Sequence, residues 1–207
     1  MRIKVVPRKR PLAALFFVGG NMELESKRLY YRPLKQEDAC DLYEIYSQQE
    51  AVRWLSVPRH IDVEETLEGI RACELECRTS HQPMPFVLIE KRFEKLIGTI
   101  DFHHLSSPHS MEIGYLLHPS YWHLGLMSEA LTCILDYGFE KMDLHRVNAV
   151  CALQNTASIA LLERKGFHRE GTYPKTMLLG DGRYHVMLLF SLMREEWRNP
   201  YEERIGS

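Results

Sequence analysis

The sequence predicts one α/β domain built on a mixed, mostly antiparallel sheet of seven strands flanked by helices. Apolar residues recur at strand or helix spacing in the order strand, two helices, three strands, helix, strand, helix, two strands. Short, turn-rich connections join the three middle strands, which indicates antiparallel neighbours. A helix joins the last of these to the next strand, so those two strands can lie parallel. A chain of 207 residues with 45% hydrophobic content fits a single domain.

The strands are recognised by short apolar runs between turn residues such as "SSPHS" and "GDG". Pro33 ends the first of them, and "GDG" turns the chain between the last two. The seven strands are expected at residues 29–34, 86–90, 96–103, 111–117, 146–152, 173–179 and 183–193.

The helices carry recognisable end signals. Asp62 and Glu65 form a D-x-x-E capping box at the start of the second helix. Asn155 is a suitable N-cap for the last helix, and Gly166 suits its left-handed end. The four helices are expected over residues 36–46, from 62 to a break at 80–85, after 125, and from 155 to 166.

The two ends of the chain differ from this domain. Residues 1–21 contain five basic residues and no acid, so we expect an extension that is disordered or stems from a mis-annotated start; a basic interaction tail that binds nucleic acid is the alternative. The domain is expected over 22–198, with a tail at 199–207.

Composition narrows the class of protein. The net charge of −2 gives no general argument for nucleic acid or an anionic membrane surface, and no apolar run reaches the roughly 18 residues of a membrane span. An odd count of five cysteines favours reduced thiols in a cytoplasmic protein. Cys73 and Cys77 lie four residues apart without a matching ligand pair, so core packing is preferred to a zinc site.

The stretch "YWHLGLMSEAL" carries the chain from a strand directly into a helix. The first N–H groups of a helix lack intrahelical partners and, with the helix dipole, favour a bound phosphate. Gly125 has no side chain to keep such an anion from the backbone. A glycine before a helix is more often only a turn, so this loop needs further support.

That support is a resemblance. "LYYRPLKQEDA", "FVLIEKRFEKLIGTIDF", "MEIGYLLHPSYWHLGLMSEAL", "RVNAVCALQNTASIALLERKGFHREG" and "GRYHVMLLFSLMREEW" resemble, in order, the GNAT superfamily of acyl-CoA N-acyltransferases, in particular its ribosomal-protein N-terminal (alanine/serine) acetyltransferases. The resemblance extends from residue 22 to about 197 and implies a splayed central strand pair. The branch's loop reads Q/R-x-x-G-x-G/A, from which Trp122 and Met127 depart.

The resemblance implies acetyl-CoA as cosubstrate. No metal is expected, because the ten histidines lack an H-x-x-x-H or H-E-x-x-H spacing on a helix. Backbone amides of 123–128 would hold the pyrophosphate of acetyl-CoA, and the strand at 115–117 would pair with its pantetheine arm. Asn155 would contact the pantetheine besides capping its helix, and Lys165 would either screen a phosphate or complement the helix C-terminus. The implied cosubstrate-binding residues are Tyr115, Leu116, Leu117, His123, Leu124, Gly125, Leu126, Met127, Ser128, Asn155 and Lys165.

For catalysis, the resemblance implies Glu112 as the base that takes a proton from the amine and Ser158 as hydrogen-bond donor to the leaving thiolate. Their structural alternatives are a solvent-facing strand glutamate and a helix-start serine. His103 or His104 is an alternative base, and because neighbours on a strand face opposite ways only one of them can serve. A backbone N–H near Leu116 would meet the oxyanion. Tyr173 and Tyr184 are weaker alternatives to Ser158 as donor.

The predicted function is direct acetyl transfer from acetyl-CoA to a primary amine, foremost a protein N-terminal amine. A small amine (polyamine, aminoglycoside or amino acid) and a catalytically silent acyl-CoA-binding module are the alternatives. The resemblance only weakly implies a homodimer, and neither membrane nor nucleic acid is an expected partner. The acceptor cleft is expected to include Arg53, Trp54, His60 and Tyr184.

Overall fold

The computed structural model describes residues 24–107 and 109–197, without the side chains of 104–107, 175 and 176. The predictions for residues 1–21 and 199–207 therefore lie outside the described residues, and so does the side chain of His104.

Eight strands form one sheet in the order β1-β2-β3-β4-β5-β6-β8-β7. Every neighbouring pair is antiparallel except β5 and β6, which are parallel. The predicted mixed, mostly antiparallel sheet is thus confirmed, with one strand more than expected. The strands are β1 (Leu24–Glu25), β2 (Leu29–Pro33), β3 (Phe86–Glu90), β4 (Lys95–Ser107), β5 (Ser110–Leu117), β6 (Arg146–Ala152), β7 (His168–Leu178) and β8 (Tyr184–Met193).

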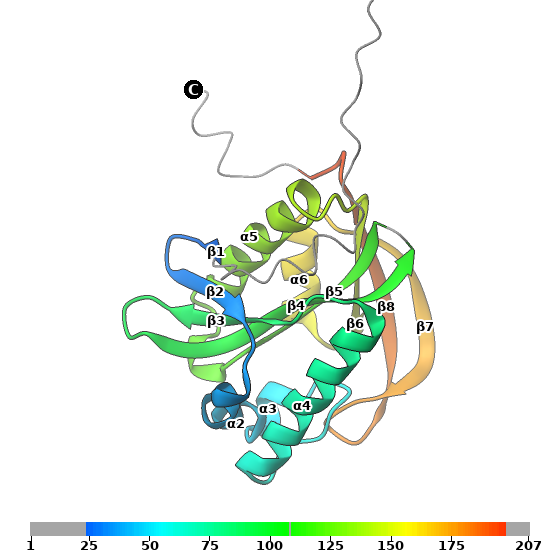
Figure 1. Ribbon diagram of the computed structural model, residues 1–207. Coiled ribbons are helices and arrows are strands. Elements are labelled where there is room, and N and C mark those ends of the chain that lie inside the picture. Colours follow the sequence, from blue (N-terminus) through cyan, green and yellow to red (C-terminus); the bar gives the residue numbers. More distant parts are fainter. Residues whose placement is uncertain (1–23, 108, 198–207) are drawn as a thin grey trace, which may run out of the picture.

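Helices cover both faces of the sheet (Figure 1). One face packs against α5 and α6 in the larger hydrophobic core, and the other packs against α2 and α4 in a second core. These helices are α2 (Ala39–Tyr46), α3 (Gln49–Val52), α4 (Val63–Ser80), α5 (Leu126–Glu140) and α6 (Thr156–Arg164), with 3₁₀ turns η1 (Gln36–Asp38) and η2 (Pro119–Tyr121).

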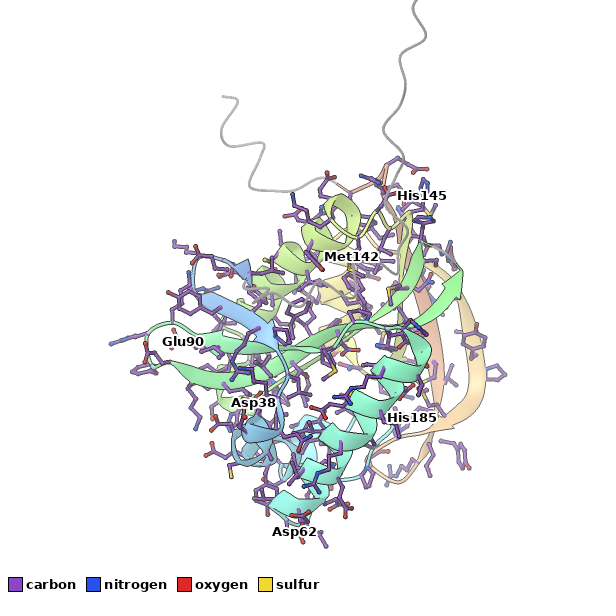
Figure 2. All side chains as sticks on the ribbon, viewed as in Figure 1. Asp38, Asp62, Glu90, Met142, His145 and His185 are labelled. Atoms are coloured by element: carbon purple, nitrogen blue, oxygen red, sulfur yellow. The ribbon has the colours of Figure 1, made fainter. Side chains whose placement is uncertain are left out.

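The predicted helix ends are confirmed. Asp62 caps α4 by accepting the Glu65 N–H at 2.8 Å, and Figure 2 shows Asp62 where that helix begins. Asn155 caps α6 by accepting the Ser158 N–H at 3.2 Å. Gly166 follows α6 with a φ of +85°, a conformation that costs glycine little.

Strand ends differ more from the prediction. β7 begins at His168, five residues before the expected start at Tyr173. It is the edge strand of the sheet, and its first residues are mostly exposed and polar, so they carry no alternating apolar pattern. β1 is only two residues long, which is too short to give any periodic signal.

The parallel strands β5 and β6 stay together for only part of their length. Their register comprises Ser110 opposite Arg146, Met111 opposite Val147 and Glu112 opposite Asn148. Beyond Glu112, β5 remains paired with β4, while β6 remains paired with β8. The two central strands therefore part, as the resemblance predicts.

Candidate active site

A cavity of about 570 Å³ opens where β5 and β6 part. It is lined by residues of both strands, of the loop before α5, of α6, and of α3 with the loop after it. Of the residues predicted from the sequence, the lining includes Glu112, Tyr115, Leu116, Leu117, His123, Gly125, Leu126, Met127, Ser128, Asn155 and Ser158. Leu124 and Lys165 are not part of it.

The loop before α5 bends sharply into the helix. His123 and Gly125 have φ angles of +60° and +73°, and α5 begins at the next residue, Leu126. Because the first N–H groups of a helix have no partner one turn earlier, those of Leu126, Met127 and Ser128 point out of the helix end. A Cβ on Gly125 would have a single neighbour within 4 Å, the Arg28 Nη2 at 3.7 Å, so the space in front of this loop is open. Its exposed amides suit an anionic ligand.

A buried carboxylate fixes this loop. Glu129, in the first turn of α5, is only 5% exposed. It accepts hydrogen bonds from the Arg28 backbone N–H at 2.6 Å, the Arg28 Nε at 2.7 Å and the Ser26 hydroxyl at 2.7 Å. The Arg28 Nη1 also donates to the Leu124 carbonyl at 2.9 Å. This clamp is not among the features predicted from the sequence, although an acid among the apolar residues of a helix's first turn is a signal for one.

The backbone of β5 faces the cavity at alternate residues. The His118 N–H, which directly follows β5, donates to the Ile97 carbonyl of β4. Ile97 precedes Gly98, the β4 residue that pairs with Leu117. Since hydrogen-bonding direction alternates along a strand, the N–H and C=O of Leu116 also point toward β4. Those of Tyr115 and Leu117 point into the cavity. Leu116 also lines the cavity, but its N–H and C=O point toward β4, so Tyr115 and Leu117 are better placed than Leu116 for the predicted backbone contacts.

Trp122, where the family's loop carries Gln or Arg, contacts the same strand. Its indole Nε1 donates to the Leu117 carbonyl at 2.8 Å. This bond ties the loop to the end of β5 and occupies one of the carbonyls that face the cavity.

Glu112 belongs to a chain of three ionisable groups. The His103 Nε2 lies 3.4 Å from a Glu112 carboxylate oxygen, and its Nδ1 lies 2.6 Å from the Asp101 carboxylate. Burial alone would lower the pKa of His103, but hydrogen bonds to Asp101 and Glu112 outweigh it and raise that pKa to about 10. The imidazole is therefore a cation at neutral pH. Gly114 makes room for it, because a Cβ there would lie 2.8 Å from the ring.

Ser158, in the first turn of α6, contacts Tyr115 of β5. Their hydroxyl oxygens are 2.7 Å apart. Burial raises the pKa of Tyr115 above its ordinary value of 10.0, so its hydroxyl stays protonated at neutral pH. Only a backbone contact is predicted for Tyr115 from the sequence, whereas its side chain places a second hydroxyl beside Ser158.

Glu112 and Tyr115 lie on opposite faces of the sheet, because their positions on β5 differ by an odd number. Both line the cavity, so the cavity passes through the sheet where the strands part. One opening thus brings a carboxylate from the α2/α4 face and two hydroxyls from the α5/α6 face to the same gap.

Lys165 lies away from this gap. Its Nζ is 2.5 Å from the Thr132 hydroxyl on α5, and burial together with nearby Arg164 lowers the pKa of this lysine. Arg164 is the basic residue of α6 that lines the cavity. It follows Leu161 by three residues and Ala157 by seven, so all three lie on one face of the helix, and Ala157 and Leu161 also line the cavity.

The predicted acceptor residues separate into two groups. Trp54 lines the cavity, and the Arg53 guanidinium lies 4.6 Å from its ring centre. His60 instead stacks on Tyr46 with ring centres 4.7 Å apart, and Tyr184 is 62% exposed and outside the lining. Tyr173 is also outside it.

Within residues 24–107 and 109–197, no group of three or more His, Cys, Asp or Glu side chains could hold a metal ion. The same described residues contain no helix with the length and hydropathy to span a membrane.

A parted parallel strand pair with a glycine loop and a helix N-terminus beside the parting defines an acyl-CoA-dependent N-acyltransferase. Residues 28–168 match the family model described as acetyltransferase (GNAT) domain. The chain therefore belongs to the GNAT family, and it is an N-acetyltransferase.

Similar proteins agree with this assignment. The chain is 31% identical over 178 residues to the uncharacterized N-acetyltransferase p20 of Bacillus licheniformis, covering 84% of this chain and 97% of p20. It is 33% identical over 114 residues to the [ribosomal protein uS5]-alanine N-acetyltransferase of Escherichia coli, covering 54% and 58% of the two chains. The crystal structure of a GNAT-family acetyltransferase from Bacillus anthracis superimposes with a TM-score of 0.74 at 27% identity, covering 84% of this chain and all of that one.

Proposed function

We propose that this protein transfers the acetyl group of acetyl-CoA directly to the N-terminal amine of a protein. The observation that supports this most is the cavity at the parting of β5 and β6, which is lined by Glu112 from one face of the sheet and by Ser158 from the other. Direct transfer needs a base on the amine side and a hydrogen-bond donor on the thiolate side. The Escherichia coli relative, named for an N-terminal alanine, supports the protein acceptor.

The donor side fits acetyl-CoA. The amides at 123–128 and the open space over Gly125 suit its pyrophosphate, and Arg164 adds a positive charge to the cavity lining. The Tyr115 backbone and the Leu117 N–H face the parting, where they pair with the pantetheine arm in the manner of an added strand. Asn155 lines this end and contacts the arm beside its capping role.

Glu112 takes the proton from the acceptor amine. An amine is largely protonated at neutral pH, so it needs a base before its lone pair attacks the thioester carbonyl. The His103 imidazolium, held against Asp101, orients the Glu112 carboxylate toward the cavity. The Tyr115 N–H, which faces the parting, donates to the oxygen that becomes negative during attack.

Tyr115 and Ser158 then assist the C–S bond as it breaks. Because their hydroxyls are hydrogen-bonded to each other, one of them can donate to the departing sulfur while the other donates to its partner. Tyrosine is the more acidic of the two, so it gives the thiolate the proton that forms the thiol of free CoA, and it regains a proton from the nitrogen, which loses its second proton as the amide forms.

The test measures acetyl-CoA consumption with purified protein and three kinds of acceptor: peptides with free N-termini, polyamines and aminoglycosides. Acetylation of peptides at the α-amine, located by mass spectrometry, is the expected result. Activity confined to polyamines or aminoglycosides would refute the protein acceptor. Glu112→Gln and Ser158→Ala should each reduce turnover by about 10²-fold while leaving acetyl-CoA affinity unchanged. A parallel loss of affinity would reassign both residues to structure.

A further inference from the structure

The acceptor end of the cavity has apolar walls from three segments. Trp54 and Leu55 follow α3, Met177 and Leu179 lie at and directly after the end of β7, and Met187 belongs to β8. Leu179 and Met187 are 4% exposed and form, with Ala152 and the partly buried Trp54 and Val150, a small hydrophobic cluster separate from the two main cores. Met177 is 40% exposed, at the open side.

The His185 side chain packs against the Trp54 ring. His185 belongs to β8 and is labelled in Figure 2. The two rings meet edge to face with centres 5.4 Å apart. His185 is fixed through both ring nitrogens, with Nε2 2.9 Å from the Asp181 carboxylate and Nδ1 3.1 Å from the Gln154 side-chain oxygen. The aromatic wall is therefore positioned before any acceptor arrives.

The walls are also joined to each other. The Gly180 N–H donates to the Leu55 carbonyl at 2.8 Å, and the Gln49 amide donates to the Gly180 carbonyl at 2.7 Å. A Cβ on Gly180 would lie 2.3 Å from the Val52 carbonyl oxygen, so the turn between β7 and β8 packs directly against the segment after α3. Such a joined wall keeps its shape and selects by size and polarity.

The charges at this end are few. Glu50 and Glu112 are the acidic residues of the described lining, and the His103 cation is already paired with Glu112 and Asp101. The cationic amine is matched at Glu112, Glu50 is the one further carboxylate of the described lining, and the rest of the acceptor meets indole, thioether and methyl groups. Burying polar groups without partners is unfavourable, whereas an apolar side chain gains from the same contact.

We propose that the acceptor pocket selects a protein N-terminus whose first residue has a bulky apolar side chain, such as leucine, methionine or phenylalanine, over alanine or serine. This inference rests on the proposed function and specifies its acceptor. The α-amine lies at Glu112, and the first side chain lies among Trp54, Leu179, Met177 and Met187. Methionine side chains adapt to different apolar shapes, so the pocket distinguishes apolar from small or polar first residues more than it distinguishes among apolar ones.

The experiment compares kcat/KM for peptides that are identical except for a first residue of leucine, methionine, phenylalanine, alanine or serine. We expect the apolar first residues to exceed alanine and serine by about tenfold or more, the range that extra methylenes in an apolar pocket provide. Trp54→Ala and Met177→Ser should each reduce that ratio toward one. Met177 is exposed, so its replacement leaves folding intact. The control is Phe93→Ala, an aromatic truncation at a 65% exposed site outside the cavity, which should keep the ratio.

The outcomes separate the two proposals. Peptide acetylation without an apolar preference, or with alanine or serine preferred, overturns the pocket inference and leaves the protein acceptor standing. An apolar preference that survives both Trp54→Ala and Met177→Ser also overturns it, because the preference then arises elsewhere. Acetylation of small amines but of no peptide overturns the protein acceptor and the pocket inference together.

Discussion

The contacts among Asp101, His103 and Glu112 depend directly on the absence of a side chain at Gly114. An added Cβ would lie 2.8 Å from His103 Cε1 and 3.3 Å from an Asp101 carboxylate oxygen. The His103 ring must therefore shift, whereas the Asp101 oxygen need give by only a few tenths of an ångström. The glycine in "EIGY" is thus explained by a side chain on the neighbouring strand, since Gly114 pairs with Asp101 and the His103 ring fills the space beside it.

We predict that Gly114→Ala lowers kcat/KM by about 10- to 100-fold, because a displacement of under 1 Å at a catalytic group has effects of that size. In a His103→Ala background the same substitution should cause no further loss, since the ring it displaces is gone. Steady-state kinetics of the four proteins measures this. Gly171→Ala is the control, because a Cβ there would meet nothing within 4 Å. Equal losses from Gly114→Ala in both backgrounds would show that the ring is not what the glycine accommodates.

The pKa of His103 makes a second residue-scale prediction. Because the folded-state pKa is about 10 against an ordinary value of 6.5, the charged ring stabilises the fold fully below about pH 6.5 and loses that effect as the pH rises through about 10. The difference in unfolding free energy between the wild type and His103→Gln should therefore shrink between these pH values. Urea denaturation at several pH values measures it. A difference that stays constant or grows with pH would mean that the ring is neutral in the folded protein.

Residue types and motif positions predicted much of this site. Glu112, Ser158, Asn155 and Gly125 all line the cavity, as the resemblance implies. Side-chain direction was harder to predict. Lys165 follows the buried residues Leu161 and Leu162 by four and three positions, which is a helical signal for packing rather than for a cavity contact.

At the scale of elements, the junction between the loop and α5 carries the proposed cosubstrate site. The left-handed Gly125 lets the loop end with its amides exposed, and the Arg28–Glu129 clamp keeps it there. Element order and most boundaries follow from periodicity and caps. The clamp cannot be predicted from periodicity or caps, because it joins residues about a hundred positions apart in the sequence. The early start of β7 cannot be predicted from them either, because edge strands can be polar on both faces.

Gly125 and Gly182 have nearly equal φ angles, +73° and +75°. Substituting each of them therefore distinguishes the cost of backbone strain from the loss of ligand contact. Replacing either by alanine should cost about 1–2 kcal/mol of stability, the penalty for a left-handed side-chain-bearing residue. Only Gly125→Ala should also weaken acetyl-CoA binding, by about tenfold, because its Cβ enters the space in front of the amides. Chemical denaturation and isothermal titration calorimetry measure the two effects. If the two variants bind acetyl-CoA with the same affinity, the loop is only a turn.

At the scale of the whole molecule, function depends on a sheet that is continuous at its edges and open in its centre. The α5/α6 side offers helix amides and Arg164 to an anionic donor, and the other side offers Glu112 and Glu50 to a cationic acceptor. The pattern of strands and helices predicts that β5 and β6 can be parallel. How far they stay paired depends on contacts across the complete fold, so the extent of the parting comes only from the structure.

The most direct test of the central claim is a titration of ¹⁵N-labelled protein with acetyl-CoA, followed through the backbone amide resonances. We predict saturable changes concentrated at residues 123–128 and at Tyr115 and Leu117, with smaller changes at Leu116, whose N–H belongs to the β4 ladder. An absence of changes at residues 123–128, or saturable changes centred on another part of the molecule, would contradict the claim that acetyl-CoA binds at the parting of β5 and β6.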